Sequence, residues 1–189
     1  DSFEWVTRFA DPQFKYHAAQ ARVATAMMMR VANADVLPYD YAEFGRTMKQ
    51  YVGPVDKAST ARGWALNTAP LSAVIATMEL AGAAFNATRD SVLAATPAKG
   101  AATSANAALM QVERALTRPE GLRTRPWYRN LIYVADEDNG YSNMVFPSVN
   151  EAIRAGDQGL AQRELDDLVQ RFGAATAAIE RARAALGSR

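Results

Sequence analysis

Few residues in this sequence are of the types that perform catalysis or bind metals. The 189 residues include one histidine, His17, and no cysteine. A Ser/His triad needs an oriented imidazole, and zinc sites take three or four ligands from His, Cys and carboxylates. His17 follows Tyr16 and has no second His or Cys nearby, so we expect a hydrogen-bonded structural histidine. The sequence predicts no catalytic residue and no metal ligand in this chain.

The most concentrated polar segment is residues 136–140, Asp-Glu-Asp-Asn-Gly. An EF-hand calcium loop needs Gly at its sixth position and Glu at its twelfth. Tyr141 and Pro147 stand at those positions, so we interpret the segment as an acidic surface turn. Three arginines before it could form an anion site, although ion pairs within the scaffold are the favoured interpretation: Arg123, Arg125 and Arg129.

The overall composition predicts a folded domain and argues against two classes of partner. The chain is 49% hydrophobic, long enough for one domain with a core. Its 21 Lys and Arg residues balance 20 Asp and Glu residues, so we expect no nucleic-acid partner. The longest charge-free apolar stretch, residues 63–78, contains Pro70 and is shorter than the roughly 20 residues that span a bilayer. We therefore expect no membrane contact from this chain.

Hydrophobic residues recur at spacings of three and four along most of the chain, which predicts helices. The spacing, together with proline and glycine punctuation, places helices at about 12–33, 41–55, 71–92, 105–116 and 157–186, with a loop at 97–104. A repeat averaging 3.5 residues on several helices is typical of antiparallel bundles. We predict an all-α fold: a helical bundle of four long helices plus a short one.

Start and stop signals support these helices. Asp11 before Pro12 is a typical N-cap pair, and Asp40 followed by Glu43 reads as a capping box. Gly53-Pro54 should break or kink the second helix. The run Met27-Met28-Met29 is expected to fill the core, since methionine packs well into irregular gaps.

One segment, residues 119–150, does not follow the helical pattern. It contains three prolines and the extended run 131–134, Leu-Ile-Tyr-Val. It also concentrates aromatic residues, which disordered linkers avoid. An irregular insertion of this length in a compact bundle is usually functional, so we expect the functional residues here.

Short segments distributed through residues 4–155 resemble the C-terminal helical domain of the glutamate carboxypeptidase II and transferrin receptor family. They are residues 9–17, 36–41, 113–116, 119–122, 125–129 and 132–133, followed by Tyr141 and Phe146-Pro147. The resemblance implies one dimerisation domain over residues 1–189, of which residues 1–10 lead in from a missing protease-like domain. That domain would hold two zinc ions, and this chain would need no cofactor of its own.

The same resemblance implies that the loop 135–147 completes a substrate pocket. Family members selective for glutamate carry Lys-Tyr in this loop. Tyr141 corresponds to that Tyr and would hydrogen-bond the terminal carboxylate of a peptide substrate. Gly140, after Asn139, stands where the Lys would pair with an acidic side chain, which puts selectivity for glutamate in doubt. An alternative is that Asn139-Gly140 is only a tight turn, in which Gly supplies a positive φ and Lys would be strained.

Three functions remain open at this point. The first is a homodimerisation and pocket-completing domain of a zinc-dependent carboxypeptidase-like protein, inert alone and partnered by its own protease-like domain. The second is a receptor-like binding domain attached to a protease-like domain that has lost its metals. The third is a free-standing interaction bundle. The family resemblance implies a secreted, periplasmic or membrane-anchored ectodomain.

Overall fold

The computed structural model describes residues 2–95 and 99–187 and confirms an all-α fold with a very small sheet. Its contacts divide the chain into two compact units, Asp1–Pro38 and Tyr39–Arg189. Each unit is described by itself below. The single-domain assignment over 1–189 stays a prediction.

The first unit contains α1 (Phe3–Trp5), the π-helical turn η1 (Val6–Ala10) and α2 (Lys15–Ala32). The predicted helix start at Asp11-Pro12 is wrong, because Pro12 and Gln13 form a turn and Phe14 has a left-handed backbone with φ 54°. Asp11 still caps α2 from outside the helix. Its Oδ2 accepts a hydrogen bond from the backbone N–H of His17 at 2.9 Å and lies 2.7 Å from Nδ1 of the same residue. The structural role expected of His17 is confirmed.

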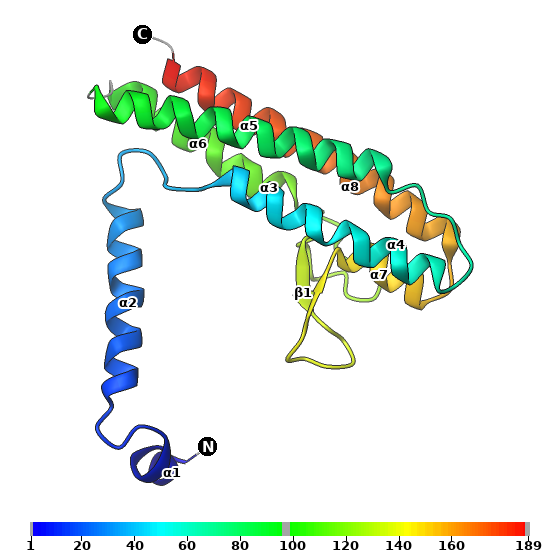
Figure 1. The fold of residues 1–189 in the computed structure, drawn as a ribbon, viewed down its shortest axis with the longest axis horizontal. Coiled ribbons are helices and arrows are strands. Elements are labelled where there is room, and N and C mark those ends of the chain that lie inside the picture. The colour runs from blue at the N-terminus through cyan, green and yellow to red at the C-terminus, as the bar shows by residue number, and fades with distance from the viewer. Residues whose placement is uncertain (1, 96–98, 188–189) are drawn as a thin grey trace. The chain divides into compact units, whose positions relative to one another are not determined.

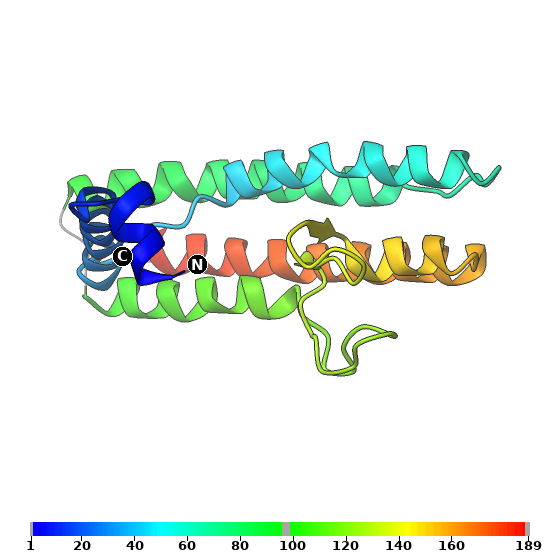
Figure 2. The ribbon, with the colours of Figure 1, turned by 90° about the horizontal axis from the view of Figure 1, so that it is seen from below.

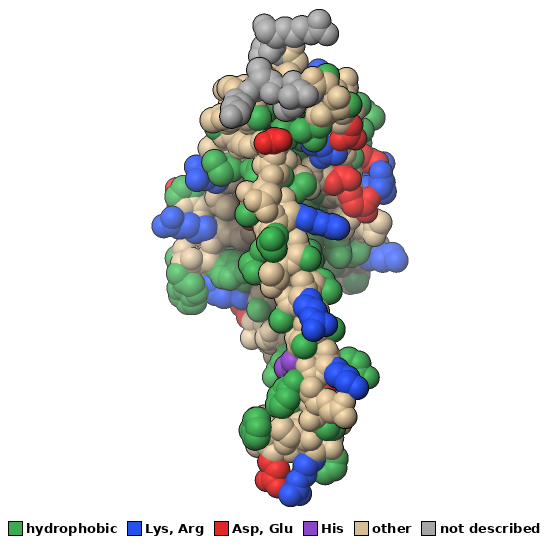
Figure 3. Space-filling view, turned by 90° about the vertical axis from the view of Figure 1, so that its left-hand side faces the viewer, with side chains coloured by type: hydrophobic (Ala, Val, Ile, Leu, Met, Phe, Trp, Pro, Cys, Tyr) green, Lys and Arg blue, Asp and Glu red, His purple; other side chains and the backbone are tan. Residues whose placement is uncertain are grey.

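Helix α2 buries none of its side chains. The core-filling role expected of Met27-Met28-Met29 is therefore wrong, since all three are exposed. Within this unit no other helix packs along α2, so its apolar spacing has no surface to cover. Figure 3 shows hydrophobic and basic side chains together with the single histidine on the surface of this unit.

The second unit is a helical bundle. Its main rods are α3 (Tyr41–Gln50) continued by α4 (Val52–Thr60), then α5 (Ala69–Ala94), α6 (Lys99–Ala115) and α8 (Gln158–Gly187). Figures 1 and 2 show these rods running side by side. Helix α8 packs on both α5 and α6, and α3 packs on α5. Phe172 of α8 lies at the centre, stacked on Phe44 at 6.5 Å and edge-on to Phe146 at 6.3 Å.

Two boundaries differ from those expected. The break expected near Gly53-Pro54 is confirmed but falls at Tyr51, which places Pro54 in the first turn of α4. A missing N–H costs nothing there, because the first-turn amides have no helical partner. The loop expected at 97–104 is wrong from Lys99 onward, since α6 begins there; residues 96–98 lie outside the described residues. The alanines at the start of α6 have a high helix propensity, which outweighs the low propensity of the Gly and Ser among them.

Helices α3 and α5 cross at unusually close range. A Cβ added to Gly82 would lie 2.3 Å from the backbone nitrogen of Ala42, and one added to Gly45 would lie 3.0 Å from Glu79 Cα. The two glycines let the backbones meet with no side chain between them. Beside this crossing, Asp40 accepts hydrogen bonds from the N–H groups of Ala42 and Glu43, which confirms its role as N-cap of α3.

The irregular insertion is more ordered than its sequence suggested. β1 (Tyr133–Ala135) pairs antiparallel with β2 (Asn143–Val145), with Val134 opposite Met144. Helix α7 (Pro147–Arg154) begins before residue 150. The predicted end of the irregular insertion at residue 150 is therefore wrong. Pro147 occupies the start of this helix, where its fixed φ favours helix formation.

A set of ion pairs joins the start of the insertion to the bundle. Arg118 Nη1 donates to Glu164 of α8 at 2.7 Å and to Asp167 at 3.3 Å, and its Nε donates to the carbonyl of Gly121 at 3.1 Å. These side chains are mostly buried, so the pairs are little screened by water. The insertion is therefore anchored to α8.

Within the described residues, α5 is the one helix long and apolar enough to span a bilayer by length and composition. Its buried side, which includes Leu71, Ile75, Met78 and Phe85, lies in the bundle against α3 and α8. That packing is typical of the core helix of a bundle. The absence of membrane contact stays a prediction.

Candidate functional site

The segment with the predicted site residues is the loop 136–142, which joins β1 to β2. Figure 1 shows this hairpin standing away from the helical rods of the second unit. All residues from Glu137 to Asn143 are exposed. The loop is thus held at its base by two short strands and presented to the surroundings at its tip.

Asp136 organises this loop through its carboxylate. Oδ1 accepts hydrogen bonds from the backbone N–H groups of Asp138 at 2.9 Å and Asn139 at 3.2 Å. Oδ2 accepts a 2.5 Å bond from Arg154 of α7, and the Asp136 N–H donates to the Ser142 carbonyl at 2.8 Å. One side chain thus links both sides of the loop to a helix.

The Arg154 guanidinium holds the pKa of Asp136 at about 2, below its usual 3.8, with the two loop N–H groups acting in the same direction. Arg154 also lies 3.4 Å from Asp138. Hydrogen bonding to the carboxylate raises the pKa of Arg154 in turn. The loop geometry therefore depends on an ionised Asp136.

The three predicted site residues lie next to one another at the loop tip. Asn139 Oδ1 accepts from the N–H of Tyr141 at 3.2 Å, and the Asn139 carbonyl accepts from Ser142 at 3.0 Å. The Tyr141 side chain is 103% exposed and makes no hydrogen bond or ring contact with any described residue. The turn fixes its backbone, while the phenol points to the surroundings.

Gly140 is not constrained to be glycine by its backbone. The glycines with positive φ in the described part of the chain are Gly63, Gly121 and Gly156, and Gly140 is not among them. A Cβ added to Gly140 would meet nothing within 4 Å. The segment is an acidic surface turn, as expected, but the strain that the tight-turn alternative predicts for lysine at Gly140 is absent.

A second arginine braces the hairpin at the residue directly before Asp136. Arg125 donates to Glu151 of α7 at 2.7 Å and to the carbonyl of Ala135 at 2.7 Å, directly before the loop. Arg123 lies 4.0 Å from Asp157. The scaffold interpretation is thus confirmed for Arg125 and Arg123. No ion pair or hydrogen bond is found for the Arg129 side chain among the described residues.

Arg125 was singled out from the sequence, but its partner Glu151 and the Arg154–Asp136 pair were not. Arg154 and Asp136 are 18 residues apart, and Arg125 and Glu151 are 26 apart. Each pair depends on the position of α7, which the sequence analysis assigned to the insertion. The signal that could have found them is Pro147 as a helix start, since it would have placed Glu151 and Arg154 one turn apart on one helix.

The described residues contain no group of three or more His, Cys, Asp or Glu side chains placed to hold a metal ion. Of the loop carboxylates, Asp136 is engaged by Arg154 and by backbone N–H groups, and Asp138 lies 3.4 Å from Arg154. Residues 2–95 and 99–187 therefore provide no donor set that fits a zinc site.

Comparison with known proteins identifies relatives of this chain. The family model described as transferrin receptor-like dimerisation domain matches residues 66–180. The probable glutamate carboxypeptidase LAMP1 of Arabidopsis thaliana is 29% identical over 153 residues, covering 81% of this chain and 22% of that protein. The probable glutamate carboxypeptidase VP8 of Zea mays is 28% identical over 159 residues, with the same two shares.

A further relative carries a different activity in its name. Aminopeptidase NAALADL1 of Rattus norvegicus is 23% identical over 189 residues, covering 98% of this chain and 25% of that protein. The chain thus spans about a quarter of the length of the relatives it matches. Because the family model covers more than half of the sequence, the chain belongs to the family of transferrin receptor-like dimerisation domains.

Proposed function

We propose that this chain is the homodimerisation and substrate-pocket-completing domain of a zinc-dependent carboxypeptidase-like protein. It has no catalytic residue of its own. The observation that carries the proposal is the loop 136–142, which is braced by Arg154 and Arg125 and yet presents Tyr141 with no partner in this chain. A rigid turn with an unused phenol is suited to contact a molecule outside this domain.

The proposed role of Tyr141 is to donate a hydrogen bond to the terminal carboxylate of a peptide substrate. The two zinc ions belong to a protease-like domain outside this sequence, where they would supply the hydrolytic chemistry. The names of LAMP1 and VP8 support a carboxypeptidase, whereas NAALADL1 is named an aminopeptidase. An aminopeptidase has no need of the terminal carboxylate, so the experiment must separate the two activities.

The first test is Tyr141→Phe in the longer protein that contains this chain. Removing one hydrogen bond to a charged group should cost about 1.5–3 kcal/mol, or roughly tenfold to hundredfold in kcat/KM. The loss should occur for peptides with a free C-terminus and not for their C-terminal amides. Tyr51→Phe, at an exposed tyrosine between α3 and α4, is the matched control and should change neither rate. An equal loss on both substrate forms would contradict the assignment.

The second test is Gly140→Lys, which the open space around Gly140 permits. The added ammonium should favour a C-terminal Glu over a C-terminal Gln, since only Glu can form a charge-assisted bond with it. Gly140→Met adds similar length without charge and should leave the Glu/Gln ratio of kcat/KM unchanged. If Gly140→Lys lowers both rates equally, Gly140 lies outside the pocket.

The receptor-like alternative has an outcome of its own. A longer protein whose protease-like domain lacks zinc ligands would hydrolyse none of these peptides, with or without added zinc. Tyr141→Phe would then change binding of a partner and no rate. Sequencing the region upstream of residue 1 distinguishes the two proposals before any kinetics are measured.

A further inference from the structure

A cavity of about 300 Å³ opens on the side of the bundle between α3, α6 and β1, and its described lining includes no residue of the loop 136–142. Its floor is apolar: Val112, Leu116 and Ile132 are all buried. Four aromatic side chains line it, namely Tyr39, Tyr41, Phe44 and Tyr133. Cavities that bind small ligands begin at about this volume, so there is space for one small molecule or one side chain.

The aromatic walls are held in place by the surrounding structure. The Tyr41 hydroxyl donates to the Leu109 carbonyl at 3.2 Å, and the Tyr39 ring meets the Tyr41 ring edge-on at 5.8 Å. On the other side, Asn130 Oδ1 accepts from the N–H of Tyr133 at 3.1 Å. Phe44 is stacked on Phe172 of the core. A cavity with fixed walls loses little entropy when a ligand enters.

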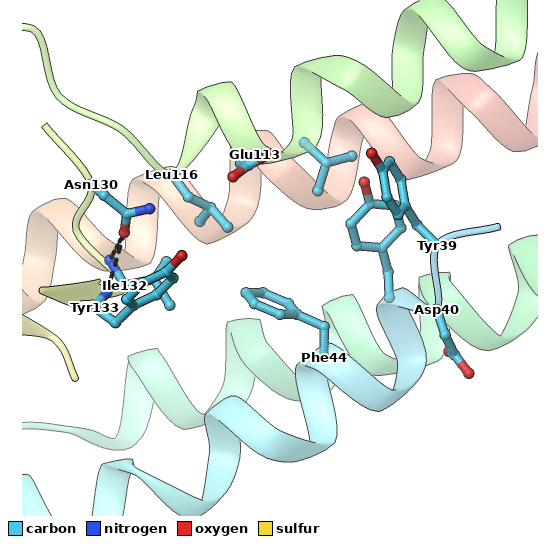
Figure 4. Close-up of a pocket in the computed structure, with 10 residues that line it drawn as sticks. Tyr39, Asp40, Phe44, Glu113, Leu116, Asn130, Ile132 and Tyr133 are labelled. Atoms are coloured by element: carbon cyan, nitrogen blue, oxygen red, sulfur yellow. Dashed lines mark hydrogen bonds between the residues drawn. The ribbon is translucent and has the colours of Figure 1, made fainter. Parts of the chain in front are cut away.

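The charge of the lining is negative. Glu113 and Asp40 line the cavity, and its described lining includes no Lys, Arg or His. Figure 4 shows the Glu113 carboxylate on the α6 side of the cavity, opposite Phe44. The Asp40 carboxylate points away from the cavity and accepts a hydrogen bond from the Ala42 N–H at the start of α3. No ion pair or hydrogen bond is found for the Glu113 side chain among the described residues. Burial raises the pKa of the Tyr41 hydroxyl, and Tyr39 and the Glu113 charge raise it further.

We propose that this cavity binds an organic cation with an apolar stem, the chemistry of an alkylguanidinium or alkylammonium group. The stem would lie on Val112, Leu116 and Ile132, while the cation would contact aromatic faces and the free carboxylate of Glu113. Aromatic rings attract cations through their negative faces, and Arg and Lys side chains carry such a stem. Glu113 is exposed at the rim of the cavity, so its carboxylate repels an anion and offers a neutral ligand no charge-assisted contact.

The direct test is an NMR titration of the whole 189-residue chain, followed at the methyl groups of Val112, Leu116 and Ile132. The probe is n-butylguanidinium, and n-butylurea is its neutral counterpart of equal shape. For a ligand this small we expect a Kd of roughly 1–10 mM, with the urea binding about fivefold to tenfold more weakly. Equal affinity for both probes, or no methyl shifts at about 50 mM, would overturn the proposal.

Two variants locate the binding energy. Glu113→Gln should weaken n-butylguanidinium binding about threefold to fivefold and leave n-butylurea unchanged, because it removes charge and not shape. Tyr133→Leu should likewise weaken only the cation, since it replaces a ring by an aliphatic wall. Glu120→Gln, at an exposed carboxylate outside the cavity lining, is the control and should change neither affinity. Unchanged cation binding in Glu113→Gln would refute the assignment of the carboxylate.

A final comparison distinguishes a free cation from a side chain within a polypeptide. A blocked Gly-Arg-Gly peptide and its Gly-citrulline-Gly counterpart differ only in charge. Shifts of the same methyl groups with the Arg peptide alone identify a side-chain receptor. Binding of n-butylguanidinium without the peptide identifies a site for free cations. Binding of both peptides with equal affinity contradicts the cation proposal.

Discussion

Asp136 is a single residue on which the geometry of the proposed site depends. Its carboxylate joins the two sides of the loop and receives Arg154 from α7. Asn139, Gly140 and Tyr141 then follow within one turn. The exposed phenol is therefore positioned by a network in which no member touches it.

The lowered pKa of Asp136 predicts how the loop responds to acid. Because the pKa of Asp136 is lower in the folded loop than in the unfolded chain, its ionised carboxylate stabilises the folded loop at pH values above the unfolded pKa of 3.8. This stabilisation is lost as the pH falls toward the folded pKa of about 2. We expect the amides of Asp138 and Asn139 to lose hydrogen-exchange protection between pH 4 and pH 2. Carboxyl NMR titration of Asp136 measures the pKa directly.

Arg154→Gln tests the cause of that shift. Without the guanidinium, the pKa of Asp136 should rise toward 3.8 and the loss of amide protection should move to higher pH with it. Arg183→Gln removes an exposed i,i+3 ion pair with Glu180 on α8 and is the matched control. An Asp136 pKa that stays near 2 in Arg154→Gln would assign the shift to the loop N–H groups instead.

At the scale of helices, the close crossing of α3 and α5 makes a sharp prediction. Gly→Ala inside a helix normally stabilises by about 0.5–1 kcal/mol. Gly82→Ala should instead lower the free energy of unfolding by about 1–3 kcal/mol, because its Cβ would overlap the backbone of Ala42. Gly173→Ala on α8, where the nearest atom is Val74 Cγ2 at 4.0 Å, should give the ordinary gain.

Urea denaturation of both variants measures the two changes. Opposite signs are expected, and an equal gain in both would mean that α3 is not held against α5 at Gly82. The comparison also tests the packing of α3, which carries Phe44 to the wall of the cavity.

The sequence predicted the helices wherever proline, capping residues and an apolar repeat agreed. Asp40 and Pro70 are examples, since each lies at the start of a helix as expected. It failed in two places. Residues 99–104 are helical although Gly and Ser interrupt them, because the alanine-rich sequence has sufficient helix propensity. Met27-Met28-Met29 are exposed although methionine suits a core, because no other described helix of their unit packs along α2.

The candidate loop was located from the sequence, but its support was not. Prolines and clustered aromatic residues marked the insertion, and the resemblance to a family selected Tyr141. Arg154 and Glu151 reach the hairpin only because α7 folds back beside it, and no local pattern encodes that distance. The cavity walls come from α3, α6 and β1, which lie far apart in sequence.

At the scale of the whole molecule, the outer face of α5 is an apolar surface that no other described helix of the bundle covers. This helix is the most apolar long helix of the described chain, yet much of it is not buried. Its exposed positions from Ala73 to Ala87 are uncharged, namely Ala73, Thr77, Leu80, Ala83 and Ala87, and the exposed Asp90 follows them. Leu80 is 72% exposed. An uncharged exposed stripe of this length is suited to bury itself against a second copy.

We therefore predict that the chain forms a twofold dimer through α5. Such an interface is self-complementary, and a stable one buries more than about 1,000 Å² in total. Light scattering coupled to gel filtration, at tens of micromolar chain, should give twice the mass of the chain. Leu80→Glu places two carboxylates in the contact and should yield a monomer with unchanged helical content. Met110→Glu, on the exposed side of α6, is the control and should remain dimeric. A dimer that survives Leu80→Glu and is lost in Met110→Glu would show that the interface lies on α6 instead. A monomeric parent chain would mean that α5 alone cannot hold the two copies together.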